Sequence, residues 1–445
     1  MPTPSTITVS IASLTNLLAG RLGCNLTQQD YWNAPELDLY IRMTMREFQV
    51  LTAYWRDRVT LTTAANTPWY DLNALGIVPF TLQDTGILQQ VGYQLLEYSG
   101  TQAGFINSNQ FSLSAVAAAF DQRQEEILGE TRLMVTDYPA YSGGPPADGR
   151  IPLSSGVIQI HRADWFDTPG GQWGLVSRSD EMGASGWTPG WNLNPAVPQG
   201  YATALTRPFV VQLVPPPLND GQLDLLVTSC QPYVYTGSPQ GLQIPDDASF
   251  ALPWGILASV LSQDAQSRDY RRAAYALNRF RGALEVLKSF PLVMQAWPSG
   301  IQQEPAGLYQ LDHWKNGWRN ATGSPTTVAN GGRNLLAASP VPSAPGAIAL
   351  DCCVNSPASQ PDRTVTFDLA GDVVSGILSG AQHLACFKMG GAEFEGTFPL
   401  YQDFLTVAEK NADRLRAQSI NWKALRDIAV IEAADKPYEM QEVEA

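Results

Sequence analysis

The chain is poor in the residues that carry most enzyme chemistry. It contains three histidines and five cysteines, and charged residues make up only 16% of its length, against roughly 25% in ordinary soluble proteins. No cysteines have the C-x-x-C spacing of a metal or redox site. His161, His313 and His383 stand apart from each other and from cysteine or aspartate at ligand spacing. We therefore interpret them as packing or surface residues and expect no metal and no cofactor.

Sequence signatures of nucleotide binding and hydrolysis are missing as well. There is no P-loop, no G-x-G-x-x-G after a strand, no G-x-S-x-G elbow and no H-E-x-x-H. Asp246 and Asp247 resemble a pair of catalytic carboxylates, but they follow Pro245 and precede a helical pattern. That position favours helix-start residues over acid–base catalysis. We name no catalytic residue and predict that the chain is not an enzyme.

Long apolar runs and basic stripes are also lacking. No stretch of 18 apolar residues exists, and the first residues lack the pattern of a secretory signal, so we expect no membrane partner. The net charge of −14 argues against specific nucleic-acid binding, which needs cations to neutralise phosphates. An acidic surface would let DNA slide past without sticking, although solubility alone also explains this charge.

What the chain does contain points to a packed protein with much contact surface. Apolar residues make up 44% of the sequence, and glycine, proline and tryptophan are abundant at 37, 32 and 12 copies. A length of 445 residues predicts two or three domains. Few charges combined with many aromatics are typical of proteins with large interfaces.

Hydrophobic periodicity places the principal elements. Residues 35–57 and the pair of segments in 250–290 have the 3.6-residue spacing of amphipathic helices. Residues 207–229 alternate apolar and polar on either side of a proline-rich turn, which predicts a β-hairpin. Residues 139–150 combine glycine and proline densely, so we expect an exposed loop there. Residues 400–428 predict one long amphipathic helix.

These patterns predict an α+β protein with a helical core, β-hairpins, an inserted β-rich domain and a helical C-terminal extension. The core combines two segments separated by the insert, which contains one helix and a tryptophan-rich β region. The expected boundaries are 1–100 and 205–290 for the helical core, 101–204 for the insert, 291–366 for a loop-rich extension, 367–430 for C-terminal helices and 431–445 for an acidic tail.

The order of these segments resembles a known family. The core carries DYWNAPELDLYIRMTMREFQVLTAYWRDRVTLTTAANTPWYDL, then RPFVVQLVPPPLNDGQLDLLV, then IPDDASFALPWGILASVLSQDAQSRDYRRAAYALNRFRGAL. This succession of helix, hairpin and closing helix pair resembles the head-to-tail adaptor (connector) proteins of tailed bacteriophages, in the enlarged form of some short-tailed phages. The resemblance covers roughly residues 5–75 and 205–290, about a third of the chain. Typical adaptors are shorter, so the insert and the segment after 290 are departures.

The resemblance implies a virion protein that acts by assembly. Adaptors form a homo-oligomeric ring of about twelve copies beneath the portal protein, contact tail nozzle or fibre proteins, and surround a channel through which genomic DNA passes without specific binding. Such a protein is assembled in the host cytoplasm and resides in the neck of the virion. Large aromatic residues are the best candidates for its subunit and partner contacts, and we expect Trp55, Trp165, Trp173, Trp187, Trp191, Tyr270 and Phe280 to serve there.

A second interpretation rests on the tryptophan-rich insert. Trp165, Trp173, Trp187 and Trp191 lie in β-rich, glycine- and proline-rich sequence, and exposed tryptophans there could stack on sugar rings. The alternative function is therefore a tail-fibre or host-glycan-binding component. The same residues could instead hold a small β domain together or anchor a subunit interface, which the lack of acidic and amide partners at defined spacing favours.

Overall fold

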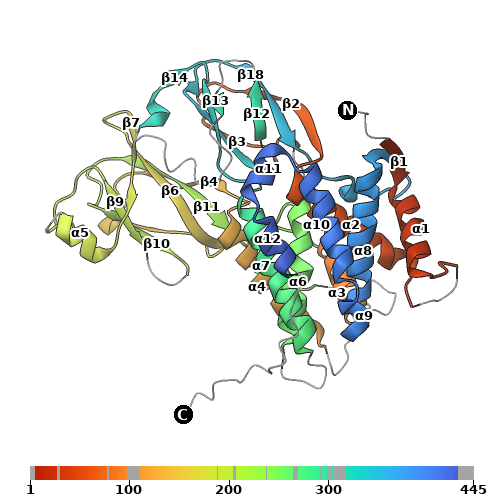
Figure 1. The fold of residues 1–445 in the computed structure, drawn as a ribbon. Coiled ribbons are helices and arrows are strands. Elements are labelled where there is room, and N and C mark those ends of the chain that lie inside the picture. The colour runs from red at the N-terminus through yellow and green to blue at the C-terminus, as the bar shows by residue number, and fades with distance from the viewer. Residues whose placement is uncertain are drawn as a thin grey trace, which may run out of the picture.

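The computed structural model describes residues 6–428, except 28–30, 78–79, 98–110, 188, 204–206, 237, 264–268, 291–292, 298–301 and 304–316. The described chain forms a helical body, a β-lobe on one side of it and a β-cap above it (Figure 1). This arrangement confirms the predicted α+β class. The acidic tail at 431–445 and His313 lie outside the described residues.

The helical body is built around α6 (Ala251–Leu261), which is buried on nearly all sides. Such a uniformly apolar helix belongs at the centre of a bundle, where every face meets another element. The amphipathic helices around it turn their apolar faces inward and share one hydrophobic core. They are α1 (Ile11–Leu22), α2 (Ala34–Thr52), α3 (Asp84–Gln94), α4 (Leu113–Thr131), α7 (Tyr270–Lys288), α8 (Gly371–Cys386), α9 (Gly391–Glu395), α10 (Phe398–Asn411) and α12 (Trp422–Ile428). The short helix α11 (Arg414–Ser419) packs against α2 with Arg416 buried.

The predicted helix over 35–57 ends earlier than its apolar pattern suggested. Ala53 adopts a left-handed conformation with φ of 53°, and the chain leaves the helix there. The Gln49 side chain then donates to the carbonyl of Trp55 at 2.7 Å and accepts from its N–H at 2.8 Å. These two bonds satisfy the backbone N–H and carbonyl of Trp55, which would pair within the helix if the helix continued. Trp55 therefore lies in the short connection between α2 and the next strand.

The β-lobe is a sandwich of two four-stranded sheets, ordered β5-β10-β9-β8 and β4-β11-β6-β7. Buried residues from both sheets meet in one apolar cluster, as in aligned sheet packing. Its elements are β4 (Thr136–Gly143), β5 (Arg150–Pro152), β6 (Val157–Asp167), β7 (Gln172–Leu175), β8 (Ser177–Arg178), the short helix α5 (Glu181–Trp187), β9 (Gly200–Thr203), β10 (Val210–Val214) and β11 (Gly221–Ser229).

The hairpin predicted over 207–229 is wrong, although both of its strands exist. β10 pairs with β5 and β9, whereas β11 pairs with β4 and β6 in the opposite sheet. The turn between β10 and β11 therefore crosses from one sheet of the sandwich to the other. The predicted common face is nevertheless real, because Val211 and Leu213 of β10 meet Leu223 and Leu225 of β11 in the sandwich core.

The loop predicted over 139–150 is also wrong in its first half. Residues 136–143 form β4, which pairs with β11 at one edge of its sheet. Pro139 is accommodated there because an edge strand has one side without ladder bonds.

The β-cap contains most of the segment predicted to be loop-rich, 291–366. The cap has two main sheets, ordered β12-β18-β2 and β13-β15-β16-β3. In them β18 pairs with β2 and β16 pairs with β3, although β2 and β3 precede their partners by more than 200 residues. The strands are β2 (Arg56–Thr63), β3 (Trp69–Asp71), β12 (Val293–Trp297), β13 (Gln302–Gln303), β14 (Thr322–Gly323), β15 (Thr327–Asn330), β16 (Leu335–Ser339), β17 (Val341–Pro342) and β18 (Gly346–Cys353).

A two-stranded sheet pairs the first described strand, β1 (Thr6–Ser10), with β19 (Thr366–Ala370), the strand that leads into α8, beside α1 (Figure 1). Of the C-terminal helices, α8, α10 and α11 pack against α2, α8 also contacts α1, and α12 packs against α7 and α10. The single helix predicted for 400–428 is three, because Asp413 and Asn421 bond the backbone N–H groups of Leu415 and Ala424 and so begin new helices.

Candidate functional site

Two of the predicted interface aromatics are core residues of this chain. Trp165 on β6 is 2% exposed and lies in the sandwich core, and Phe280 on α7 has no exposed surface. Phe280 packs inside the helical body, where the Arg123 guanidinium lies 5.2 Å from its ring centroid. Because these rings are enclosed by their own chain, the expectation that they contact a partner is corrected for both residues.

Trp55 and Trp173 also make contacts within the chain. The half-buried Trp55 ring packs edge-on against Phe48 and Tyr54, with centroids 6.0 and 5.3 Å apart. Trp173 on β7 lies at the junction between the β-lobe and the β-cap, against Phe166 and beneath the Arg319 guanidinium. Both rings therefore hold elements of one copy together.

The remaining predicted residues lie nearer the surface. Tyr270, at the start of α7, is 56% exposed, and Trp191 is half-buried in the loop that follows α5. Trp187 is the last residue of α5, and its side chain lies outside the described part. The seven predicted residues therefore lie at separate places in the body and the lobe.

The helical body instead encloses a polar network that the sequence did not reveal. Arg279 of α7 bonds both carboxylate oxygens of Glu47 on α2, at 2.8 Å each. Tyr401 of α10 donates to Glu47 at 2.8 Å, and the guanidinium lies 3.8 Å from the Tyr401 ring centroid. Arg279 also donates to the Tyr275 hydroxyl at 3.1 Å. One buried arginine therefore links three helices through charge-assisted bonds and ring contacts.

His383 of α8 extends this network. Its two ring nitrogens lie 2.6 Å from the Tyr275 hydroxyl and 2.8 Å from Thr397 Oγ1. Burial, reinforced by the positive charge of Arg279, holds the pKa of His383 well below its usual value. Since the ring is buried and both nitrogens are engaged, it packs as a neutral histidine, as the sequence predicted.

His161 is also a packing residue. Its Nε2 lies 2.7 Å from Thr228 Oγ1 within the β-lobe. Burial, with a smaller effect from the nearby Arg132, lowers its pKa to about 3. An imidazole with that pKa stays uncharged near neutral pH and is a weak proton acceptor there.

A pocket of about 440 Å³ lies beside the start of α2. At its base the Lys388 ammonium lies 2.8 Å from a Glu36 carboxylate oxygen, and Tyr40 donates to the same carboxylate at 2.7 Å. Burial raises the pKa of Glu36 and lowers that of Lys388, because desolvation outweighs their mutual attraction. The exposed side chains of Tyr31 and Leu96 form the rim.

The β-lobe is attached to the β-cap through Arg319. This residue follows Trp318 in a short 3₁₀ turn, and its guanidinium lies 3.5 Å from the Trp173 ring centroid. Its Nη1 also lies 2.8 Å from the Asp224 carboxylate on β11. The neighbouring Asn320 side chain bonds both backbone polar groups of Trp173. These contacts hold the β4-β11-β6-β7 sheet of the lobe against the β-cap.

The paired aspartates before α6 serve a structural purpose. Both lie in the first turn of a 3₁₀ helix, as predicted, but their carboxylates bond other segments. Asp246 accepts from Thr81 and Leu82, and Asp247 accepts from Ser356. Burial raises the pKa of Asp247 to about 6. The two carboxylates thus fasten separate loops to the body.

The vicinal cysteines Cys352 and Cys353 are buried packing residues. Burial raises the pKa of Cys352 to about 12 and that of Cys353 to about 11, which disfavours the nucleophilic thiolate. Among the described residues, no three His, Cys, Asp or Glu side chains gather closely enough to hold a metal ion. Within the same residues, no helix has the length and apolar character needed to cross a bilayer.

No protein-family model matches this chain, and no curated protein is significantly similar to it in sequence.

The sequence contains a signal for the two buried ion pairs, although their residues were not predicted as a site. Glu36 and Glu47 lie within the apolar stripe of α2, alongside Leu37, Tyr40 and Phe48. A carboxylate on a buried stripe requires a partner, because an unpaired buried charge is costly. The sequence therefore indicates that partners exist, but their identities, Lys388 and Arg279, follow only from the tertiary fold.

Proposed function

We propose that this chain is a structural protein of a tailed-phage virion, a head-to-tail adaptor that forms a ring of about twelve copies between the portal and the tail. In this role it contacts the portal protein on one side and tail nozzle or fibre proteins on the other. The genome passes through the channel of the ring without specific binding, which suits a chain with a net charge of −14.

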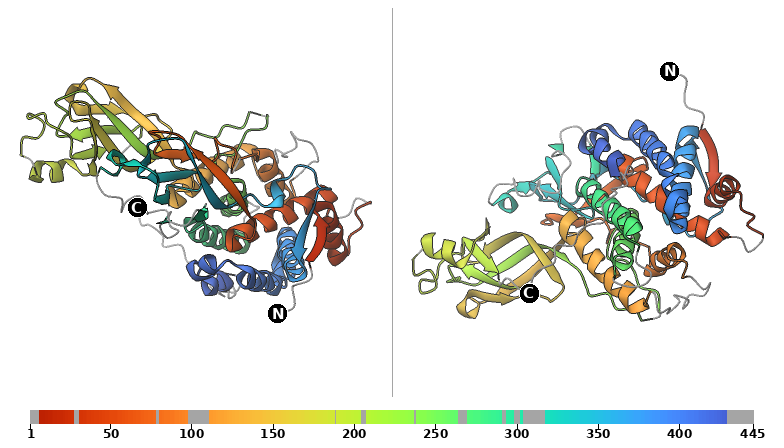
Figure 2. Two further views of the ribbon diagram at one scale, coloured as in Figure 1. Left: turned by 90° about the horizontal axis from the view of Figure 1, so that it is seen from above. Right: turned by 60° about the horizontal axis from the view of Figure 1, so that its bottom comes forward.

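One observation carries the proposal. The two segments that resemble adaptors are far apart in sequence, yet they supply the helices that meet at the centre of the body. α2 comes from the first segment, whereas α6 and α7 come from the second, and Arg279 joins α7 to α2 through Glu47. Most of the insert forms a lobe to one side, together with β10 and β11 of the second segment, whereas α4 of the insert packs in the body (Figures 1 and 2). This arrangement supports an adaptor-like core with an added lobe.

The chemistry of the described residues favours assembly over catalysis. His383 of the body is buried and His161 of the lobe is half-buried, and both are hydrogen-bonded. The vicinal cysteines are buried thiols, and the paired aspartates bond loops. The proposal accordingly assigns the chain no catalytic residue.

The glycan-binding alternative is less well supported. Sugar stacking requires an accessible ring face. Trp165 is enclosed in the sandwich core, and one face of Trp173 is covered by Arg319 at 3.5 Å. Two of the four tryptophans that suggested a glycan site are therefore occupied by contacts within the chain.

Electron microscopy of the purified protein, alone and mixed with the portal protein of the same genome, tests the adaptor proposal. A twelve-fold ring with an axial channel, formed alone or on the portal, is expected. A portal protein from an unrelated phage is the matched control and should recruit nothing. A chain that stays monomeric and ignores its own portal would overturn the proposal, and binding to host glycans would then favour the alternative.

A further inference from the structure

The last two described helices are attached to the body in different ways. α11 is fixed to the ends of two long helices, because the buried Arg416 guanidinium donates to the carbonyls of Val50 and Ser289 at 2.6 Å each. α11 cannot leave the body without losing these charge-assisted bonds. This anchorage ends at Ile420, whose backbone is extended and leads into α12.

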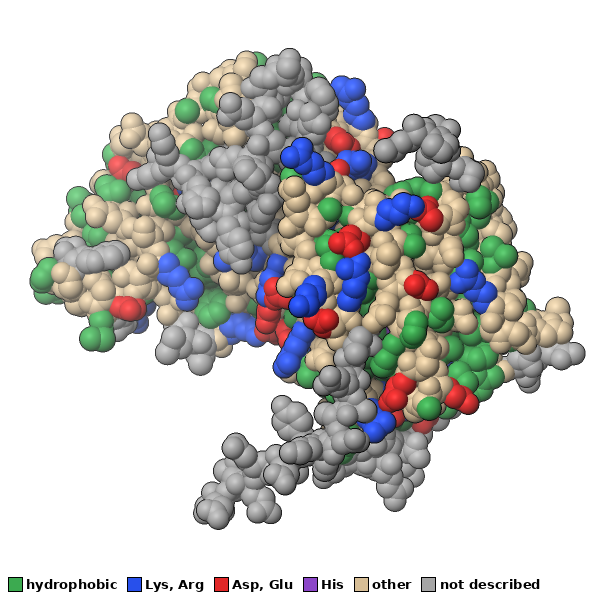
Figure 3. All heavy atoms as spheres, in the orientation of Figure 1, with side chains coloured by type: hydrophobic (Ala, Val, Ile, Leu, Met, Phe, Trp, Pro, Cys, Tyr) green, Lys and Arg blue, Asp and Glu red, His purple; other side chains and the backbone are tan. Residues whose placement is uncertain are grey.

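α12 lacks any comparable bond to the body. Within the described residues, its only polar contact beyond the connection to α11 is the ion pair of Arg426 with Glu409 on α10. These two side chains are 33% and 41% exposed. Figure 3 shows acidic and basic side chains interspersed on this face of the molecule. Exposed ion pairs of this kind add little stability, because water screens them.

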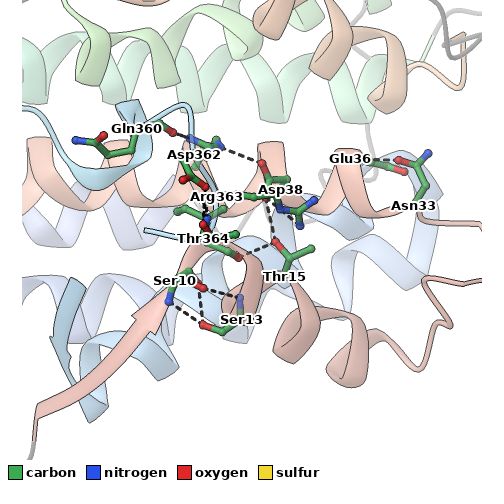
Figure 4. A network of polar contacts seen from close by, with 12 residues as sticks. Ser10, Ser13, Thr15, Asn33, Glu36, Asp38, Gln360, Asp362, Arg363 and Thr364 are labelled. Carbon is green, nitrogen blue, oxygen red and sulfur yellow. Dashed lines mark hydrogen bonds and ion pairs between the residues drawn. The ribbon is translucent and has the colours of Figure 1, made fainter. Parts of the chain in front are cut away.

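α1, another helix at the edge of the body, is tied down by polar contacts. Thr15 of α1 donates to Asp38 of α2 at 3.3 Å, and Asp38 pairs with Arg363 at 3.4 Å (Figure 4). Ser10 and Ser13 form a reciprocal capping box at the start of α1. α12 has seven residues and is too short to be a stable helix by itself in water. It therefore depends on a surface that buries its apolar face.

That surface is shaped for α12. We define the seat as the surface of α7 around Gly282, which Leu425 and Ile428 of α12 cover. Figure 1 shows α12 lying over α7. A Cβ atom at Gly282 would lie 2.7 Å from Cδ1 of Ile428 and 3.3 Å from Cδ2 of Leu425. Glycine weakens a helix interior, so this position gives up helix stability and leaves the space that α12 fills.

The seat is not completely filled. A cavity of about 10 Å³ remains between α12 and the buried Glu47–Arg279 pair, with Tyr401 at its edge. This volume holds about one water molecule. The side chains around such a gap lose dispersion contacts. α12 therefore leaves its seat at a lower cost than a fully packed helix, by local opening that does not disturb α11.

We propose that α12 is an exchangeable arm, which leaves its own seat and occupies the equivalent seat of the next copy. Every copy carries the same Gly282 seat, so a neighbour offers the one surface that α12 is seen to fit. α12 carries Lys423 and Arg426 against Asp427, and its net positive charge is attracted to another copy with a net charge of −14.

The arm and the seat are different surfaces of one chain. Their contact between copies is therefore heterologous and propagates from each copy to the next. This inference names a subunit contact within the proposed function and rests on its premise of self-association.

Cysteine cross-linking of the full chain distinguishes a neighbour's seat from the arm's own seat. Chains with Gly282→Cys and chains with Ile428→Cys are mixed, allowed to assemble alone or on the portal protein, and oxidised, with circular dichroism to verify folding. These thiols meet only where the arm of one chain lies in the seat of another, so a disulfide-linked pair of chains is expected on a denaturing gel. Gly241→Cys is the matched control, because Gly241 is exposed and a Cβ there meets nothing within 4 Å, and it should not link to Ile428→Cys.

The double variant Gly282→Cys/Ile428→Cys tests whether the arm must leave its own seat. Oxidation of the dilute monomer locks α12 in place, and the locked chain should self-associate at least about tenfold more weakly than the same chain after reduction. Light scattering and native mass spectrometry measure this difference. In the wild-type monomer, hydrogen exchange should show that the amides of α12 are less protected than those of α11.

The outcomes separate this inference from the adaptor proposal. An assembled mixture without cross-links, or α12 amides as protected as those of α7, would overturn the exchange. A twelve-fold ring formed by the locked chain would overturn the exchange and leave the adaptor proposal intact. Cross-linked oligomers without a channel would overturn the adaptor proposal and support the exchange. A wild type that stays monomeric even on the portal would overturn both.

Discussion

Arg319 lies over the ring of Trp173, with its guanidinium carbon 3.5 Å from the ring centroid. The contact joins two regions that are separate in sequence, since Trp173 belongs to β7 of the lobe and Arg319 lies in a 3₁₀ turn of the β-cap. Asp224 on the neighbouring strand β11 pairs with the same guanidinium at 2.8 Å. The direction in which the lobe projects from the body therefore depends strongly on one arginine.

Replacing Arg319 should loosen the lobe without unfolding the helical body. Arg319→Ala removes the stacking contact and leaves the Asp224 carboxylate without its cation, at a cost of about 2–4 kcal/mol in the free energy of unfolding. Urea denaturation measures the loss, and small-angle scattering should show a larger radius of gyration. Arg319→Lys keeps the charge but not the planar stacking and should recover only part of the stability. An unchanged denaturation midpoint in Arg319→Ala would contradict this role.

Gly221 begins β11 at a point where no side chain fits. A Cβ atom there would lie 2.2 Å from Cζ2 of Trp165 and 2.6 Å from the carbonyl oxygen of Phe166. Gly221→Ala should therefore displace the buried indole and destabilise the lobe by roughly 2–3 kcal/mol. The near-ultraviolet circular dichroism of the aromatic residues and the thermal midpoint report the change. Gly241→Ala, which meets nothing within 4 Å, should leave both measurements as in wild type.

Local patterns predicted which residues are buried better than which strands pair. The alternation over 207–229 placed Val211, Leu213, Leu223 and Leu225 in a common core, and the structure confirms it. The same pattern suggested a hairpin, but β11 pairs with β6 more than fifty residues earlier. Alternation specifies a face, whereas pairing depends on long-range packing that a local window does not contain.

Element ends were missed where side chains bond nearby backbone. Asp413 and Asn421 interrupt the helix predicted over 400–428, and both are good N-cap residues that could have been recognised. The strands of the β-cap are harder to anticipate, because they contain two to eight residues and are rich in alanine, serine and threonine. Such strands form because a distant partner such as β2 supplies their ladder bonds, so their own propensity says little.

The Arg279–Glu47 pair should be costly to break from one side only. Both side chains are largely buried, so Arg279→Met would leave the Glu47 carboxylate without a cation and reduce the free energy of unfolding by about 3–5 kcal/mol. Chemical denaturation of the purified variant measures this loss. The double variant Arg279→Met/Glu47→Gln removes both charges and should regain a large part of the stability. If the double variant is as unstable as the sum of its single variants, the two residues are not coupled.

Asp137 should make the lobe less stable as the pH rises. It lies on β4, its Oδ1 has no hydrogen-bond partner among the described residues, and burial together with the nearby Asp224 carboxylate raises its pKa to about 6. The folded state therefore binds this proton more tightly than the unfolded state, whose aspartate titrates near pH 4. Stability contributed by the neutral acid is complete below about pH 4 and is lost as the pH rises through about 6.

The substitution Asp137→Asn removes the charged form and isolates this effect. The variant should be more stable than wild type by about 1–2 kcal/mol at pH 8 and should show little advantage at pH 4, where the wild-type carboxyl is already protonated. Denaturation midpoints at both pH values test this, with the exposed Asp403→Asn as a charge-matched control that should show no such crossover. Arg319 faces the same cluster and partly offsets the effect, since its charge lowers the pKa of Asp137. In an Arg319→Met background the gain at pH 8 should therefore grow, and a gain independent of pH would show that the carboxyl is not the cause.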